Sequence, residues 1–208
     1  MFTWIALPHL PQPPQEFLDL ARKLCHEDTQ WNAVAHLQGS TGYRDRKLIM
    51  PDGKEVPTRF QKGYLMGEEW EQWVKENITK NFYETGARSS FGYPIHGAHS
   101  DAPPKWKLYY LVDRGGEDAV THFYKEKGQP IERLNSLPGK LIHVNDYRDL
   151  EIIDSVKWPL HQWVLMNGTI LHGVENLGEE MRINLTIAFD PYSMDLTIHT
   201  DKLTIQEE

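Results

Sequence analysis

Two histidines and an aspartate are the residues of this sequence best suited to chemistry. His99 and Asp101 form an H-x-D pair, and His172 lies far downstream. In an extended segment the side chains of residues i and i+2 share a face, so His99 and Asp101 could reach one cation. Two imidazoles and one carboxylate match the facial arrangement that leaves coordination positions open on ferrous iron. We therefore expect a metal site made of these three residues.

An arginine follows His172 after ten residues and suggests what else the site binds. Arg182, Asn184 and Thr186 alternate with the apolar residues of the same segment. If the segment is a strand, the polar side chains point into a barrel beside the metal. A buried arginine needs an anionic partner, because an unpaired buried charge is costly. A dicarboxylate bound to the metal at one end and to Arg182 at the other would supply that partner.

Other histidines and cations of the sequence offer alternatives to these residues. His96 and His99 offer a competing pair, typical of a cupin-type site, but their i, i+3 spacing should point them to opposite faces of a regular strand. A second set of basic residues flanks the expected mouth and suits either an acidic substrate or a solvated strand edge. These are Arg88, Lys105, Lys107 and Arg114. The remaining histidines are expected at the surface or in structural hydrogen bonds. They are His9, His26, His36, His122, His143, His161 and His199.

The elements that must position these residues are mostly strands. Apolar residues recur at helical spacing only in residues 15–27 and again after Gly67. Seven short segments punctuated by Gly and Pro have the character of strands. They are 91–95, 107–112, 119–124, 140–144, 151–156, 162–166 and 182–189. A hairpin is expected around Asp52-Gly53. We predict a mainly β chain with a double-stranded β-helix (jelly-roll) core and supporting N-terminal helices.

The chain is expected to form one domain with three parts. Residues 1–80 would be a helical or irregular support, 82–190 the jelly-roll catalytic core, and 191–208 an edge strand and tail. Residues 196–205 alternate as an edge strand does, so they could pair with a second copy. Seven Trp, nine Tyr and seven Phe favour a β-rich architecture.

Charge and cysteine content narrow the partners and the compartment. A net charge of −8 argues against non-specific binding to nucleic acid or to an anionic membrane. Cys25 is the only cysteine, which suits a reducing compartment. The N-terminus has no basic region before its apolar run, and no stretch approaches the roughly 20 apolar residues of a membrane span. We expect a cytoplasmic protein.

Five short motifs together resemble a known family. They are H-S-D (99–101), L-Y-Y-L (108–111), G-G (115–116), L-H-G-V-E-N (171–176) and R-I-N-L (182–185). Their order resembles the 2-oxoglutarate- and iron(II)-dependent dioxygenases, with the prolyl-hydroxylase-like, phage and bacterial members as the nearest type. The resemblance covers roughly residues 85–190.

The resemblance assigns roles to residues of this chain. His99, Asp101 and His172 would ligate Fe(II), and Arg182 would pair with the distal carboxylate of 2-oxoglutarate. Three further co-substrate residues are implied: Tyr110, Asn184 and Tyr93. Tyr110 would donate to the same carboxylate, Asn184 stands where many relatives carry serine, and Tyr93 would approach the other end.

The resemblance also implies a reaction. With O2, the family couples decarboxylation of 2-oxoglutarate, which gives succinate and CO2, to hydroxylation of a C–H bond. The substrate could be a small molecule or a peptide side chain. Two alternatives stay open: a non-catalytic jelly-roll or cupin-like domain that binds a metal or small molecule, and a structural jelly roll of a phage or capsid.

Overall fold

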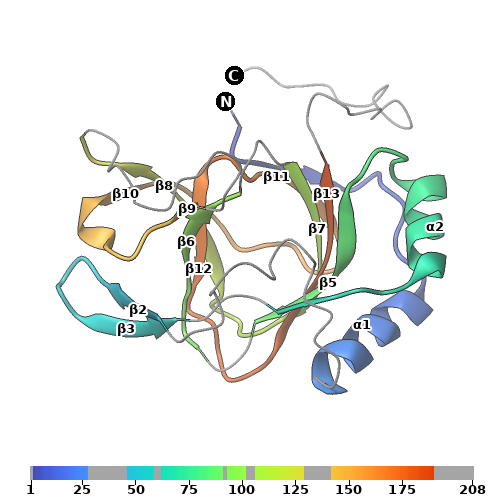
Figure 1. Cartoon of the computed structure of the whole chain (residues 1–208), viewed down its shortest axis with the longest axis horizontal. Helices are drawn as coiled ribbons and strands as arrows, with labels where there is room; N and C mark the ends of the chain where they lie inside the picture. Colours follow the sequence, from blue (N-terminus) through green and yellow to red (C-terminus); the bar gives the residue numbers. More distant parts are fainter. Residues whose placement is uncertain are drawn as a thin grey trace.

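Two antiparallel sheets face each other across a shared interior (Figure 1). The structure, a computed structural model, describes residues 2–27, 46–58, 62–90, 93–101, 106–128 and 142–189. The six-stranded sheet has the spatial order β1 (Trp4–Leu7), β11 (Trp163–Asn167), β7 (Trp106–Arg114), β13 (Arg182–Phe189), β5 (Glu84–Ser90), β4 (Lys62–Tyr64). The five-stranded sheet has the order β10 (Leu150–Val156), β8 (Val120–Glu126), β12 (Leu171–Glu175), β6 (His96–Ser100), β9 (Ile142–His143). This arrangement confirms a mainly β, jelly-roll-like fold.

Both described helices cover the outer face of the six-stranded sheet. Helix α1 (Gln15–Glu27) and helix α2 (Glu68–Asn77) lie on the same side of β5 and β13 in Figure 1. Trp70 of α2 is fully buried and donates from its indole nitrogen to Thr85 Oγ1 of β5 at 2.8 Å. The apolar residues of β13 belong to the core beneath these helices. The polar residues of β13 therefore point the other way, toward the second sheet, because side chains alternate along a strand.

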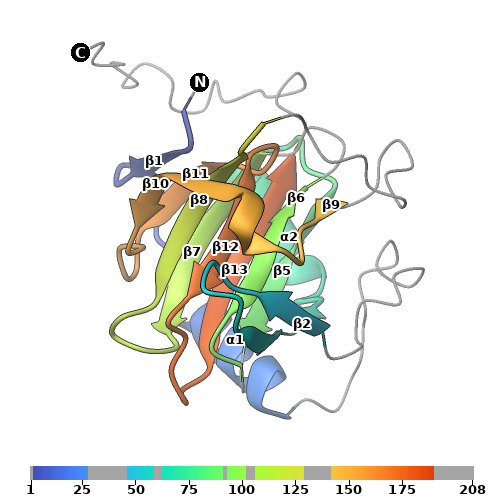
Figure 2. The ribbon, with the colours of Figure 1, turned by 90° about the vertical axis from the view of Figure 1, so that its left-hand side faces the viewer.

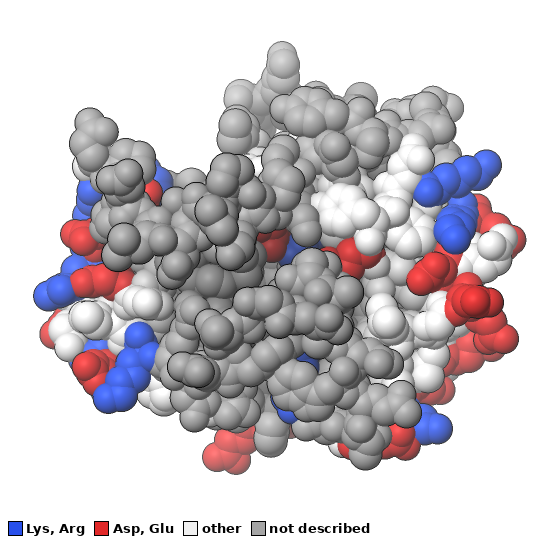
Figure 3. Space-filling model, viewed as in Figure 1, with Lys and Arg blue, Asp and Glu red and all other residues white. Residues whose placement is uncertain are grey.

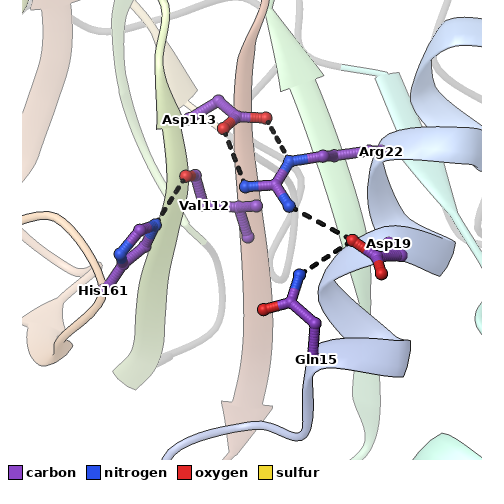
Figure 4. Close-up of polar contacts among 6 residues, drawn as sticks. All are labelled: Gln15, Asp19, Arg22, Val112, Asp113 and His161. Carbon is purple, nitrogen blue, oxygen red and sulfur yellow. Dashed lines mark hydrogen bonds and ion pairs between the residues drawn. The ribbon is translucent and has the colours of Figure 1, made fainter.

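A bidentate ion pair ties α1 to the sheet (Figure 4). Arg22 donates to both carboxylate oxygens of Asp113 on β7, at 3.1 Å each. Asp19, one turn earlier, also accepts from Arg22 and from Gln15. Because two parallel hydrogen bonds join the guanidinium and the carboxylate, they fix the orientation of the two groups as well as the distance between them. On the other side of the strand, His161 Nε2 lies 3.2 Å from the carbonyl of Val112.

The outer face of the five-stranded sheet is covered by a hairpin (Figure 2). Strands β2 (Arg46–Ile49) and β3 (Glu55–Thr58) pair antiparallel, as expected around Asp52-Gly53. Gly53 takes the positive φ of 85° that its turn requires. Leu48 packs with Ala98 and with Tyr147, which belongs to the short 3-10 helix Tyr147–Asp149. The sheet thus has a covered outer face and an inner face free to carry polar groups.

Several expected strands require correction. The strand expected at 91–95 lies partly outside the described residues, and in the part that the structure describes β5 ends at Ser90 and β6 begins at His96. His99 therefore lies on a strand rather than in a loop between two strands. His172 likewise lies on β12, which the sequence pattern did not indicate. Strands β1 and β4 belong to the six-stranded sheet, so residues 1–80 contribute more than helical support. The expected edge strand at 196–205 lies outside the described residues.

Candidate metal and co-substrate site

His99 and His172 are direct neighbours on adjacent strands. They face each other in the register of β6 and β12, and their ring centroids lie 4.4 Å apart. Both side chains are buried. The ring of Phe123, which packs in the core between the two sheets, lies 6.3 Å from that of His172. The imidazole pair therefore belongs to the inner face of the five-stranded sheet.

Backbone carbonyls fix the same tautomer in both imidazoles. His99 Nδ1 lies 2.9 Å from the carbonyl oxygen of Gly97, and His172 Nδ1 lies 2.8 Å from that of Ile170. A carbonyl only accepts, so each Nδ1 carries the proton and each Nε2 keeps a lone pair. Burial lowers the pKa of His99 to about 3 and that of His172 to about 4. Both rings are consequently neutral near pH 7, the form that binds metals.

Asp101 lies at the end of β6 and is engaged by a lysine from the opposite sheet. Its Oδ1 accepts from Lys107 Nζ at 2.7 Å, while its buried Oδ2 has no hydrogen-bond partner among the described residues. Burial by itself would raise the pKa of Asp101, but the charge and hydrogen bond of Lys107 together with the effects of His172 and His99 outweigh it and hold the pKa below its usual range. Its backbone N–H donates to the carbonyl of Gly168 at 2.7 Å.

The three expected ligands do not form a complete coordination group in this structure. Within the described ranges, no set of three His, Cys, Asp or Glu side chains converges closely enough to hold a metal ion. The two imidazoles are together, whereas the Asp101 carboxylate is aligned with Lys107. Asp101 nevertheless lies close enough to both imidazoles for its charge to act on their pKa values, which it raises against the larger effect of burial.

A third histidine joins the pair because β6 contains a bulge. The register pairs His172 with His99 but Val174 with His96, so the single residue between the pairs on β12 opposes two residues of β6. The extra residue returns His96 to the face of His99, with ring centroids 4.8 Å apart. Gly173 has no room for a side chain here, since a Cβ would lie 2.9 Å from the carbonyl oxygen of His96. The expectation that His96 faces away is wrong.

Arg182 lies on the inner face of the other sheet. Its side chain is 2% exposed, and its buried Nε has no acceptor among the described residues. Burial lowers the pKa of Arg182 to about 10, and Tyr109 opposes that effect. Two other buried atoms nearby also lack partners: Asn184 Nδ2 on the same face of β13, and Ser90 Oγ on β5 in register with Arg182. This donor-rich patch suits an anion.

The structure does not bring Tyr110 to this patch. The hydroxyl of Tyr110 donates to Gln12 Oε1 at 2.6 Å, and its ring packs against Trp163 in the core beneath the helices. Tyr109, the next residue along β7, has the inward position instead and stacks on Trp158. Tyr93 is half-buried between β5 and β6. Sequence alternation alone could not say which of Tyr109 and Tyr110 faces inward.

The basic residues expected around the mouth divide into buried and exposed groups. Arg88 is buried and forms an ion pair with Glu84 and a hydrogen bond to Thr186 Oγ1. Lys107 is buried against Asp101, as described above. Arg114 is exposed beside Glu117, so the solvated-edge interpretation holds for it. Lys105 lies outside the described residues. On the face in Figure 3, basic and acidic side chains are interspersed along both margins.

Comparisons with known proteins yield likenesses of fold. No family model and no curated protein sequence matches the chain. One similar solved structure is "the epimerase SnoN in complex with Fe3+, alpha ketoglutarate and nogalamycin RO", at 10% identity and TM-score 0.48, covering 90% of this chain and 79% of that one. Another is AviO1 from Streptomyces viridochromogenes Tue57, at 12% identity and TM-score 0.41, covering 91% and 90%.

A third similar structure is ycfD of E. coli, at 13% identity and TM-score 0.43. The match covers 90% of this chain but 49% of that chain, so the present chain spans about half of its length. At such identities the likeness concerns the fold alone. No helix among the described residues is long and apolar enough to cross a membrane. Any activity of the chain must therefore be argued from its own side chains.

Proposed function

We propose that this chain is an iron(II)- and 2-oxoglutarate-dependent dioxygenase that hydroxylates a C–H bond and releases succinate and CO2. The observation that carries the proposal is the buried guanidinium of Arg182, whose Nε has no acceptor among the described residues, on the sheet that faces the His99–His172 pair. A buried cation without a counter-ion is costly, so the site gains from an anionic ligand. The two neighbouring imidazoles would bind a metal ion, and the other end of the anionic ligand could chelate that ion.

The atoms available in the site fit an iron ion. The tautomers of His99 and His172 leave a lone pair on each Nε2, and His172 Nε2 is buried with no hydrogen-bond partner among the described residues. The Oδ2 atom of Asp101 is likewise buried and unpartnered. Two imidazoles and one carboxylate make a set of three ligands with positions left open. Bound iron(II) and 2-oxoglutarate would supply the activation of O2 and the oxidising equivalents.

The charges of the inner residues fit a dicarboxylate. Among the described residues, three buried cations, Arg88, Arg182 and Lys107, share the interior with two buried carboxylates, those of Glu84 and Asp101. Because Arg88 pairs with Glu84 and Lys107 with Asp101, the surplus positive charge is that of Arg182. A bound divalent metal would increase this surplus of positive charge. Arg182 would bind the distal carboxylate, and Asn184 Nδ2 would donate to the same group.

Anaerobic addition of Fe(II) and 2-oxoglutarate tests the proposal. A metal chelated by a 2-oxo acid should give a weak visible absorption band, and the band should disappear in His172→Ala. Arg182→Met should shift its formation to higher 2-oxoglutarate concentrations, whereas the exposed-site control Arg114→Met should behave as the wild type. An iron-loaded wild-type protein that gives no band, and that binds no 2-oxoglutarate by calorimetry, would contradict the proposal.

One observation favours a second function, a non-catalytic metal-binding domain. Asp101 is held by Lys107, and no three-residue group converges within the described part of the chain. Such a domain would bind a metal through the histidines without turning over the co-substrate. Exposure of the loaded protein to O2 separates the two functions. A dioxygenase should form succinate slowly even without its substrate, well above His172→Ala, whereas a binding domain should not.

A further inference from the structure

Lys107 is the cation closest to the expected metal ligands, and it comes from the opposite sheet. It lies on the inner face of β7 with Tyr109 and Leu111, since the alternate residues of that strand pack beneath the helices. Its side chain is 9% exposed and its partner Asp101 only 5%. The 2.7 Å contact thus spans the interior between the two sheets at the end of β6.

The buried ammonium of Lys107 has more hydrogen-bond donors than it has acceptors among the described residues. An ammonium has three N–H donors, and only one acceptor of Lys107, Asp101 Oδ1, is recorded among the described residues. If Asp101 binds a divalent metal through Oδ2, much of its negative charge is shared with that metal. The ammonium would then face two positive charges with less than one countercharge. It needs a second anion as close to the metal as Asp101 is.

We infer that Lys107 binds the carboxylate of the 2-oxo acid group that chelates the metal, while Arg182 binds the carboxylate at the other end. This assignment rests on the proposed function. It gives each carboxylate of 2-oxoglutarate its own cation, one near the start of β7 and one at the start of β13. In register, Lys107 pairs with Ala188 and Arg114 with Arg182, so the two cations lie toward opposite ends of the same pair of strands.

A purely structural role for Lys107 would leave a different signature. If the ammonium only orients Asp101, its removal should weaken binding of the metal itself. The metal-loaded protein should then bind 2-oxo acids as tightly as before. Metal affinity and oxo-acid affinity must therefore be measured separately, with Mn(II) in place of iron so that no turnover intervenes.

The experiment compares two probes in three variants by calorimetry on Mn(II)-saturated protein. Pyruvate has the 2-oxo acid group but lacks the distal carboxylate. Lys107→Gln, which keeps an N–H donor but removes the charge, should weaken 2-oxoglutarate and pyruvate alike, about tenfold to hundredfold. Arg182→Met should weaken 2-oxoglutarate alone. The control Lys125→Met, at an exposed pair with Glu151, should change neither affinity.

Each outcome either supports or contradicts the role of Lys107 in binding the carboxylate of the 2-oxo acid group. Equal 2-oxoglutarate affinity in wild type and Lys107→Gln would overturn the assignment of Lys107 while leaving the proposed function intact. Loss of 2-oxoglutarate binding without loss of pyruvate binding would also overturn it, because Lys107 would then act at the distal end. A Mn(II)-loaded wild type that binds neither probe would instead refute the proposed function. If the Gln variant does not fold, Lys107→Arg should retain both affinities within about fivefold if the charge carries the effect.

Discussion

His99 and His172 hold their Nδ1 protons in the same way, although they come from different strands. Each imidazole lies within 3 Å of the carbonyl oxygen two residues before it, that of Gly97 for His99 and that of Ile170 for His172. The ring centroids are 4.4 Å apart, and the rings point into the same interior. Strand pairing and backbone hydrogen bonds thus bring two imidazoles together in the tautomer that a metal ion would require.

The first prediction concerns metal binding by this pair. His172→Ala should lower the affinity for Mn(II) by more than about 100-fold, because loss of a ligand costs more than the 10- to 100-fold typical of a supporting residue. Calorimetry at pH 7.5 measures the affinity. His122→Ala is the matched control, since His122 lies next to Gly173 on the neighbouring strand and contacts Ser155 rather than the imidazole pair. Equal affinities in the two variants would show that the metal binds elsewhere.

The second prediction compares two buried arginines in the ligand-free protein. Arg182→Met should raise the free energy of unfolding by about 1–3 kcal/mol, because it removes a buried charge that has no recorded partner. Arg88→Met should lower it by about 3–5 kcal/mol, because the buried carboxylate of Glu84 then loses its ion pair with Arg88. Urea unfolding of both variants provides the measurement. Destabilisation of Arg182→Met would mean that its guanidinium already has a partner.

The strands that carry a clean alternation were predictable from the sequence. In β13, polar and apolar residues alternate from Arg182 onward, and the structure separates them as predicted, with the apolar side beneath the helices. The helix at 15–27 was predicted with its observed bounds, since its apolar spacing is regular. Burial on both faces conceals other strands: β5 and β6 are buried throughout and so have no alternating pattern.

Facing direction was harder to predict than element type. The choice between Tyr109 and Tyr110 depends on which face of β7 the helices cover, and that is a tertiary fact. His96 was misjudged because a β-bulge breaks the two-residue period, and a lone Gly97 in the strand was the only local signal. The partner of Asp101 was also missed, since Lys107 lies on a different sheet and had been considered only as a mouth residue.

The third prediction distinguishes two sets of ligands. His96 lies on the same face as His99, so a site of three histidines is the structural alternative to one that includes Asp101. Asp101→Asn should weaken Mn(II) binding at least tenfold more than His96→Leu, because the carboxylate supplies charge as well as an oxygen ligand. The amide oxygen can still accept from Lys107, which limits structural damage. The reverse order of affinities would favour a cupin-like site of three histidines.

The fourth prediction is the pH dependence of stability in the metal-free protein. The folded pKa values of His99 and His172, about 3 and about 4, lie below the value of about 6.5 expected in the unfolded chain. Between these values the unfolded chain binds protons that the folded protein does not. The stability that the two neutral histidines contribute should therefore be complete above pH 6.5. The free energy of unfolding should fall as the pH drops toward 4. Each histidine contributes up to about 1.4 kcal/mol per pH unit.

The ionised Asp101 also contributes stability that is lost as the pH falls, but this loss occurs at lower pH than that of the histidines. Its folded pKa lies below its usual value, so its contribution is lost only as the pH falls below about 4. The window from pH 6.5 to 4.5 therefore isolates the histidines. Urea unfolding of chelator-treated protein across that window should show a slope smaller by about one proton in His172→Asn, whose amide can still donate to Ile170. Parallel curves for wild type and variant would mean that His172 is not held neutral by the fold.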